Sequence, residues 1–119
     1  MERVNGWKVE NCPVTATMGV IGGKWKILII FVIYNEINRF GKMGMVLKGI
    51  SKQMLTTQLR ELENDGIIRR VIYPEIPPRV EYFLTEKGNS LLPIIDSMKD
   101  WGFKYLIPGH LHQGATASR

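Results

Sequence analysis

The stretch that most constrains the fold is "ISKQMLTTQLRELENDG", residues 50–66. With 3.6 residues per turn, Leu55, Leu59 and Leu62 lie on one side of a helix, which is the pattern of a core-facing stripe. The serine at its start is a good N-cap, and the Asp-Gly pair ends the helix because glycine accepts the left-handed position after the last turn. The opposite side carries short or planar polar groups instead of the usual Glu and Lys: Gln53, Thr57, Arg60 and Asn64, with Thr56 at its edge. Such groups reach phosphates and base edges, so this face is a candidate for nucleic-acid contact.

A β-hairpin is predicted directly after this helix. "IIRRVIY" and "RVEYFL" are rich in β-branched and aromatic residues, and "PEIPP" between them cannot continue either strand. Thr85 is then expected to cap a last helix, in which Pro93 marks a kink or a restart because its ring cannot sit in a regular helix interior.

The N-terminal half is predicted to be helical. Residues 12–23 form a short helix opened by Pro13 and closed by a Gly-Gly pair. Residues 24–34 favour a buried helix over a buried strand because of their length and that glycine pair. A very short strand is expected at residues 39–40, followed by a weak helix over residues 41–49, since an interior glycine costs about 1 kcal/mol of propensity.

This order of elements predicts a fold that is α+β and mostly helical. A helix pair joined by a turn and followed by a hairpin is the winged helix-turn-helix plan, in which the second helix enters the major groove and the hairpin is free to touch the flanking backbone or the minor groove. The expected organisation is a lead-in at 1–11, one winged helix-turn-helix and dimerisation domain at 12–107, and a disordered tail at 108–119.

Composition is consistent with that class. The 119 residues are 45% hydrophobic and 23% charged, as in an ordinary soluble domain, and the net charge of +5 favours an anionic partner. The longest apolar run, "ILIIFVIY" at residues 27–34, is far below the roughly 20 residues of a membrane span, so no membrane partner is expected. No signal-peptide pattern opens the chain, and its single cysteine suits a reducing cytoplasm.

Several motifs resemble the HxlR family of bacterial transcription regulators. They are "CPVTATMGVIGGKWK", "RF" followed later by "GIS", "KQMLTTQLRELENDG", "YPEIPPRVEYFLTEKGNSLLPII" and the closing "WG". They occur in the family's order from about Cys12 to Gly102, and the hairpin stretch is the most specific of them. The chain departs from the family pattern at Lys42, Met43 and Lys48.

The resemblance implies a winged-helix DNA-binding homodimer that represses or activates transcription and requires no cofactor. It makes residues 51–64 the recognition helix and residues 73–80 the wing. It also makes Cys12 the N-terminal cysteine that some family members use as a thiol sensor.

Each polar residue of the predicted recognition helix has an expected role. Arg60 suits a bidentate contact to guanine, and Gln53 suits adenine or a phosphate. Phosphate or backbone contacts are expected for the remaining members, which are Ser51, Lys52, Thr56 and Thr57. The plain alternative is that this face is only solvated.

Three basic residues outside that helix are further candidates. Arg79, at the end of the hairpin turn, is the expected wing contact to phosphate or to a narrow minor groove, and the alternative is an arginine paired with Glu75 or Glu81. Lys24 and Lys26 flank a tryptophan expected in the core, and both lysines are either solvated or phosphate-facing.

The last helix has more apolar residues than one core-facing stripe needs. Because one winged helix touches only a few base pairs, two-fold pairing is the usual way to lengthen the site. The residues predicted for a homodimer interface are Leu91, Leu92, Ile95, Met98 and Trp101, with Met18 of the first helix.

Cys12 precedes a proline at a predicted helix start, where backbone amides and the helix dipole favour a thiolate. Lys8 and Lys24 are candidates to add positive charge there. The alternative is a small buried hydrophobe that is inert to oxidants.

Enzyme and metal functions are not expected. A cysteine nucleophile needs a histidine base, and the two histidines, His110 and His112, lie at the other end of the chain, without the additional ligands that zinc requires. We therefore expect no catalytic residues, no metal and no cofactor. The remaining rival is a winged-helix protein-interaction module that does not bind DNA.

Overall fold

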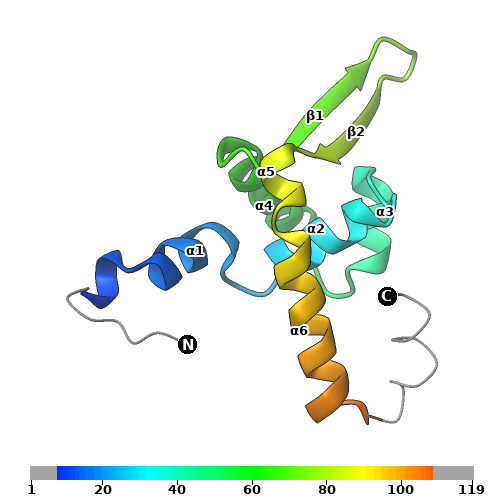
Figure 1. The fold of residues 1–119 in the computed structure, drawn as a ribbon. Coiled ribbons are helices and arrows are strands. Elements are labelled where there is room, and N and C mark those ends of the chain that lie inside the picture. Colours follow the sequence, from blue (N-terminus) through cyan, green and yellow to red (C-terminus); the bar gives the residue numbers. More distant parts are fainter. Residues whose placement is uncertain (1–7, 109–119) are drawn as a thin grey trace.

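The computed structural model describes residues 8–108. Its α-helices and strands follow the order expected of a winged helix-turn-helix, and a short 3-10 turn, η1, precedes them (Figure 1). The elements are η1 (Val9–Asn11), α1 (Pro13–Ile21), α2 (Lys26–Tyr34), α3 (Phe40–Val46), α4 (Lys52–Asn64), β1 (Ile68–Tyr73), β2 (Arg79–Leu84), α5 (Glu86–Asn89) and α6 (Leu92–Tyr105). The predicted tail, apart from Pro108, lies outside the described residues.

The core lies where α2, α3 and α4 meet the base of the hairpin and the start of α6. Most of α2 is apolar all round, as a central helix must be, and it contacts α4, β2 and α6. The buried residues of this cluster are Ile21, Ile29, Ile30, Ile33, Met43, Leu47, Leu55, Leu59, Leu62, Ile67, Ile68 and Ile95. The prediction of a buried helix rather than a strand over residues 24–34 is confirmed.

Helix α4 forms as its sequence predicts. The Ser51 hydroxyl oxygen accepts a hydrogen bond from the Met54 amide at 3.0 Å, so one of the unpaired amides of the first turn is satisfied. The predicted stripe of Leu55, Leu59 and Leu62 is buried. Gly66 takes a φ of 76°, which ends the helix and starts β1.

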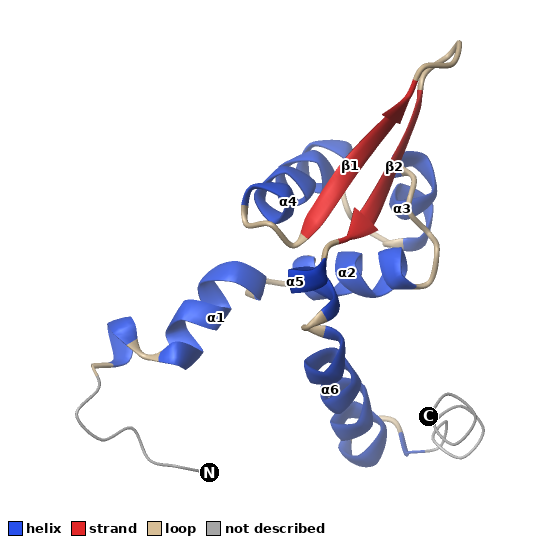
Figure 2. Ribbon diagram, turned by 45° about the horizontal axis from the view of Figure 1, so that its top comes forward, coloured by secondary structure: helices blue, strands red, loops and turns tan. Residues whose placement is uncertain are grey.

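The hairpin has a regular antiparallel register that pairs Ile68 with Leu84 and Tyr73 with Arg79. Because successive side chains point to opposite faces, the strands divide into two sets. One face carries Ile68, Arg70, Ile72, Val80, Tyr82 and Leu84, and the other carries Arg69, Val71, Tyr73, Arg79, Glu81 and Phe83. Figure 2 shows the hairpin projecting beyond the helices, with α4 and α3 on either side of its base.

The prediction of a short strand at residues 39–40 is wrong. Arg39 is instead the extended N-cap residue of α3, and Phe40 begins that helix and packs against the core. The segment does touch the sheet, since the Asn38 carbonyl accepts a hydrogen bond from the Tyr82 amide at 2.9 Å. The partly buried Phe40 ring packs against the core from α3, and the backbone of this segment contacts β2 through that hydrogen bond.

The last predicted helix is divided in two. Thr85 caps only the short α5, where its hydroxyl oxygen accepts from the Gly88 amide at 3.0 Å. Helix α6 then starts anew with Pro93 in its first turn, where a missing amide costs nothing. The predicted restart at this proline is therefore confirmed.

Helix α1 extends away from the rest of the molecule (Figures 1 and 2). Its C-terminal end is attached to the core through Ile21 and Val20, whereas Val14 and Met18 are exposed. None of the described helices is long and apolar enough to span a membrane alone; only α1 and α2 taken together, bent by 68°, reach that length and composition.

Candidate DNA-binding surface

The outer face of α4 has the polar composition predicted for it. Gln53, Thr57, Arg60 and Asn64 are exposed, and Thr56 is half-buried at the edge. The Thr56 hydroxyl donates to the Lys52 carbonyl at 2.9 Å, so its single proton is already used inside the helix. Among residues 8–108, no salt bridge involves Arg60. Its guanidinium is therefore available to an external acceptor.

A hollow of about 180 Å³ joins this face to the hairpin. Its lining residues come from α4, from β1 and β2, and from the first residue of α3: Thr56, Leu59, Arg60, Glu63, Arg70, Tyr82 and Phe40. Arg70 Nε lies 3.7 Å from Glu63 Oε1, which links β1 to α4. Burial raises the pKa of Tyr82, with Arg60 and Arg70 acting in the opposite direction. The hairpin face that carries Arg70 is thus the one continuous with the polar face of α4.

Arg79 is not a free wing contact. Its guanidinium binds Glu75 through Nε and Nη2 at 3.1 and 2.9 Å and Glu81 through Nη1 at 3.0 Å, and it lies 3.7 Å from the centre of the Tyr73 ring. The hydrogen bonds that it donates to Glu75 and Glu81 raise its pKa. The strand register also places it on the face opposite Arg70. The structure therefore agrees with the alternative prediction, in which Arg79 pairs with Glu75 or Glu81; it pairs with both carboxylates.

Glu81 connects the wing to α3. Its Oε2 also lies 3.3 Å from Nη2 of Arg39, the N-cap residue of that helix. Partial burial acts to raise the pKa of Glu81, but hydrogen bonds from Arg79 and Arg39 outweigh it and hold the pKa below its ordinary value. The cluster of Arg39, Glu75, Arg79 and Glu81, called the wing ion cluster below, is formally neutral.

The lysines predicted to face phosphates have different environments. Lys26 is 8% exposed and its Nζ lies 2.6 Å from Glu61 Oε1, so it joins α2 to α4 and does not face an external ligand. Both earlier expectations for it, solvated or phosphate-facing, are wrong. Lys24 is exposed over the Trp25 ring, which packs against the core as predicted, and Lys52 is exposed at the start of α4.

Cys12 is the N-cap of α1 and is 6% exposed. Its Sγ accepts from the Thr15 amide at 3.4 Å and lies 3.3 Å from the Thr15 hydroxyl. The hydrogen bond with the Thr15 hydroxyl and the hydrogen bond from the Thr15 amide lower the pKa of the thiol, and burial opposes them. Lys8 and Lys24, the candidates to add positive charge, are not among the causes of this shift.

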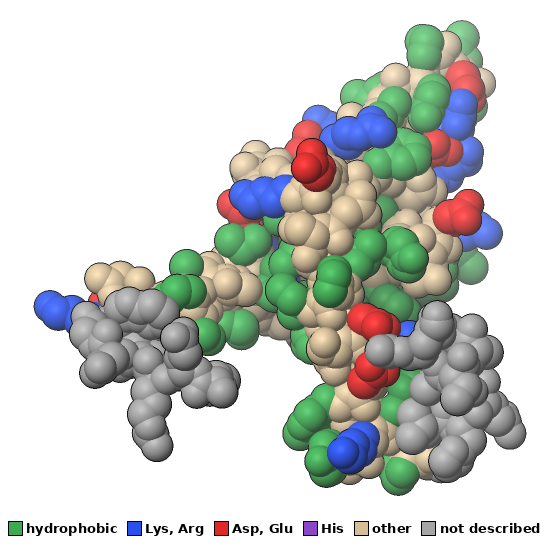
Figure 3. All heavy atoms as spheres, in the orientation of Figure 1, with side chains coloured by type: hydrophobic (Ala, Val, Ile, Leu, Met, Phe, Trp, Pro, Cys, Tyr) green, Lys and Arg blue, Asp and Glu red, His purple; other side chains and the backbone are tan. Residues whose placement is uncertain are grey.

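The residues predicted for a dimer interface fall into two groups. Ile95 is 7% exposed within the single chain, and Leu91 and Leu92 pack against the same core. Met98, Trp101 and Met18 are exposed. Sequence reasoning missed Ile94 and Tyr105, although the spacing of Ile94, Met98, Trp101 and Tyr105 is that of one helix face. Figure 3 shows hydrophobic side chains along this part of α6.

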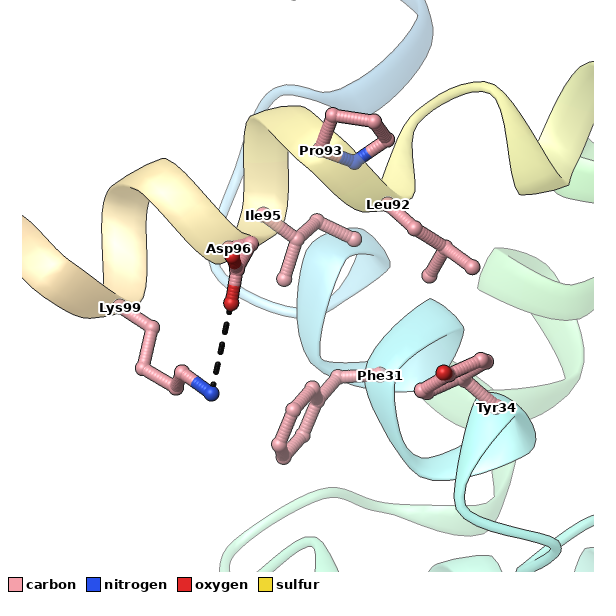
Figure 4. A pocket seen from close by; sticks show the side chains of 7 residues that line it. All are labelled: Phe31, Tyr34, Leu92, Pro93, Ile95, Asp96 and Lys99. Carbon is pink, nitrogen blue, oxygen red and sulfur yellow. Dashed lines mark ion pairs between the residues drawn. The ribbon is translucent and has the colours of Figure 1, made fainter. Parts of the chain in front are cut away.

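Two further hollows flank α6. One, of about 540 Å³, lies between α1, α2 and α6 and is mostly apolar, with Met18, Ile27 and Met98 among its walls. The other, of about 530 Å³, lies between α2 and α6, where the rings of Phe31 and Tyr34 lie opposite the start of α6 (Figure 4). Within residues 8–108, no group of three or more His, Cys, Asp or Glu side chains is arranged to hold a metal ion. His110 and His112 lie outside the described residues.

Comparisons with known proteins agree with this geometry. The HTH-type transcriptional regulator YdeP of Bacillus subtilis strain 168 is 49% identical over 96 residues, which are 81% of this chain and 75% of YdeP. The solved structure of the redox regulator HypR in its oxidized form is 47% identical, with a TM-score of 0.74 over 78% of this chain and 96% of that one. The structure of a putative HTH-type transcriptional regulator, ytcD, is 43% identical, with a TM-score of 0.76 over 80% and 97% of the two chains.

The family is identified by a match over most of the chain. Residues 20–110 match the HxlR-like helix-turn-helix family, and this range contains the predicted weak helix at 41–49, the recognition helix and the wing. Together with the capped, outward-facing α4 and the hairpin beside it, the match shows that this protein is a transcription regulator of the HxlR-like helix-turn-helix family.

Proposed function

We propose that the protein reads duplex DNA through the outer face of α4 placed in the major groove. The observation that carries this proposal is the division of α4 into a buried leucine stripe and an exposed polar face whose arginine has no acidic partner among the described residues. Arg60 would bind guanine through two hydrogen bonds, and Gln53 would bind adenine or a phosphate. Phosphate contacts are assigned to Ser51, Lys52, Thr57 and Lys24.

Binding to DNA fragments from around the protein's own gene, measured by fluorescence anisotropy at two salt concentrations, tests this function. Affinity should fall steeply as salt rises, because phosphate contacts release counterions. The rival, a winged-helix protein-interaction module, would bind no fragment or bind without salt dependence. The exposed guanidinium of Arg60 favours DNA over that rival.

The proposed assembly is a homodimer through α1 and α6. Helix α1 extends away from the rest of the chain, and its Val14 and Met18 side chains are exposed. On α6, the side chains of Met98 and Trp101 are exposed as well. An apolar groove of about 540 Å³ between these helices fits the same elements of a second chain. Two copies would place their α4 helices in half-sites about 34 Å apart, or a multiple of that.

Sedimentation of the unchanged protein and of Trp101→Ala tests the assembly. The expected result is a dimer at micromolar concentration that dissociates in the variant, since Trp101 is exposed in the single chain and its loss leaves the core intact. A monomeric unchanged protein would contradict the proposal. Glu86→Ala, an exposed change on α5, is the control.

The proposed signal is a thiol-reactive compound that acts on Cys12. Support comes from the lowered pKa of this thiol and from the 47% identity to a protein named as a redox regulator. A two-electron oxidant such as diamide would join the two Cys12 sulfurs of a dimer in a disulfide, or join one to a small thiol, with loss of both thiol protons to the reduced oxidant. Either product replaces the thiol or thiolate acceptor that caps α1 by a disulfide sulfur, which is a weaker acceptor, on the helix assigned to the interface.

Two measurements test the thiol. The alkylation rate of Cys12 should level off below the pH at which a free thiol of pKa about 8.5 does. Diamide should weaken DNA binding, and Cys12→Ser should keep basal binding while abolishing that response, because serine also caps a helix. A rate that keeps rising beyond pH 8.5, with DNA binding unchanged by diamide, would reduce Cys12 to a packing residue.

A further inference from the structure

Helix α4 is joined to the central helix α2 by an ion pair whose cation is buried. Lys26 is the first residue of α2, and its Nζ lies 2.6 Å from Glu61 Oε1 of α4. The lysine is 8% exposed, whereas the side chain of Glu61 is 49% exposed. The sequence neighbours of Glu61 are Arg60 on the exposed polar face and Leu62 in the buried stripe. The pair therefore ties α4 to the core directly beside the arginine proposed to read DNA.

A lysine is a costly way to fill this position. Its ammonium group loses most of its hydration, and it lies at the N-terminal end of α2, where the helix dipole disfavours a positive charge. An apolar side chain of similar length would fill the volume without either cost. What the pair adds is direction, because a close ion pair fixes where Glu61 lies, whereas contacts between leucines depend little on orientation.

Two further cations contact the C-terminal end of α4. Arg70 Nε lies 3.7 Å from Glu63 Oε1, and Lys87 Nζ donates a hydrogen bond to the Asp65 carbonyl at 2.7 Å. Both of these cations are exposed, so water competes with their contacts and each contributes little. Of the three cations that contact α4 here, Lys26 is the buried one, and its pair is expected to restrain the helix most.

Small rotations of α4 about its axis decide whether Arg60 reaches a base edge. A roll of about 10° moves a group roughly 6 Å from the helix axis by about 1 Å. The lengths of good hydrogen bonds span only about 0.5 Å, so such a roll breaks a two-bond contact to guanine. Attraction to the phosphates depends on charge more than on geometry, and it tolerates the same roll.

We propose that Lys26 is a positioning residue for base reading by α4. Through Glu61 it fixes the roll of the helix, and with it the point at which Arg60 meets a base pair, without touching DNA itself. This role rests on the proposed DNA binding through α4. It assigns discrimination between sequences, rather than affinity for DNA in general, to a side chain buried between α2 and α4.

Lys26→Met tests this role, because methionine fills similar space with an unbranched chain and carries no charge. The quantity to measure is the affinity ratio between the best-bound fragment and a random-sequence fragment, by anisotropy at one salt concentration. This ratio should fall roughly tenfold, through a loss at the best-bound fragment alone. The urea midpoint should not fall, since Glu61 is half-exposed and takes up water when its partner is gone.

Glu61→Ala breaks the same pair from the other side. It leaves a buried lysine without this carboxylate, so the urea midpoint should fall, and the affinity ratio should fall as in Lys26→Met. The two substitutions change the net charge in opposite directions, so a purely electrostatic effect would move their DNA affinities in opposite directions. The double variant Lys26→Met/Glu61→Ala should recover the midpoint but not the ratio, because the pair is absent from it.

Lys87→Met is the matched control. It removes the same charge and an exposed contact with the C-terminal end of α4. The affinity ratio of this variant should equal that of the unchanged protein. An equal fall in Lys87→Met would mean that the loss of any cation near α4 lowers discrimination, and it would overturn the assignment to Lys26.

The outcomes separate this role from the function on which it rests. If the unchanged protein binds no fragment better than random DNA, base reading by α4 fails, and the role of Lys26 fails with it. If the unchanged protein discriminates and Lys26→Met keeps the ratio, only the positioning role is overturned. A ratio that simply follows the urea midpoint from variant to variant overturns it as well, because the pair would then only stabilise the fold.

Discussion

The outer face of α4 and the wing both carry arginines, but these arginines differ in whether other side chains of the protein already bind them. Arg60 is exposed on α4 and forms no salt bridge with any residue of the described chain. On the hairpin, Arg79 is held by two carboxylates and an aromatic ring, and Arg70 lies near Glu63. The third hairpin arginine, Arg69, is stacked 4.9 Å from the centre of the Phe83 ring.

This difference shows that the availability of an arginine depends on its neighbours. A phosphate that recruited Arg79 would have to replace three charge-assisted hydrogen bonds and leave Glu75 and Glu81 close to the DNA backbone. Arg60 is exposed and forms no salt bridge within the described chain, so a DNA contact would replace only its hydration. The same type of side chain is therefore the proposed DNA contact on α4 and a structural residue on the wing.

The largest effect is expected from removal of the open arginine. Arg60→Ala should cost about 1–3 kcal/mol of binding free energy at the specific site and relax the preference at one base pair. Anisotropy titrations against the site and against single base-pair variants measure both effects.

Arg69→Ala is the matched control, since it removes the same charge from the far face of the hairpin. If the two variants lost affinity equally and without any change in base preference, α4 and the wing would not differ in the way described.

A smaller effect of opposite sign, a gain in DNA affinity, is expected when a carboxylate that binds the wing arginines is removed. Glu81→Gln removes the carboxylate shared by Arg79 and Arg39, so affinity for non-specific DNA should rise severalfold. The salt slope should steepen by about one unit for each extra phosphate contacted. Binding to a random-sequence fragment at several salt concentrations measures this.

Glu86→Gln makes the same charge change on α5, outside the wing ion cluster. An equal rise in both variants would mean that net charge alone is responsible, and that Arg79 is not restrained by Glu81.

The smallest effect is expected in the pH dependence of folding. The pKa of Glu81 is lowered in the folded protein, so its contribution to stability is present above its unfolded pKa and is lost as pH falls through the folded value. Urea unfolding below about pH 5 should therefore show a loss of stability that is smaller in Glu81→Gln. Parallel pH profiles for the two proteins would contradict the proposed strength of the cluster.

The sequence predicted the elements that depend on neighbouring residues. The bounds and faces of α4 follow from a serine cap, a leucine period and a glycine, all within one stretch of chain. The hairpin follows from two β-prone runs and a proline-rich turn. The sequences of this helix and this hairpin therefore suffice for the family resemblance and for the outline of the candidate site.

Only the tertiary structure decided which charges remain available. Lys26 pairs with Glu61, and Arg39 pairs with Glu81; both pairs join residues far apart in the sequence, which no local sequence pattern predicts. Ile95, predicted for the dimer interface, is buried in the core of its own chain. The division of the last helix into α5 and α6 and the assignment of Phe40 to a helix likewise depend on packing against the core. Helical period and capping are set by residues a turn apart, whereas the pairing and burial of a long side chain depend on which distant segment packs beside it.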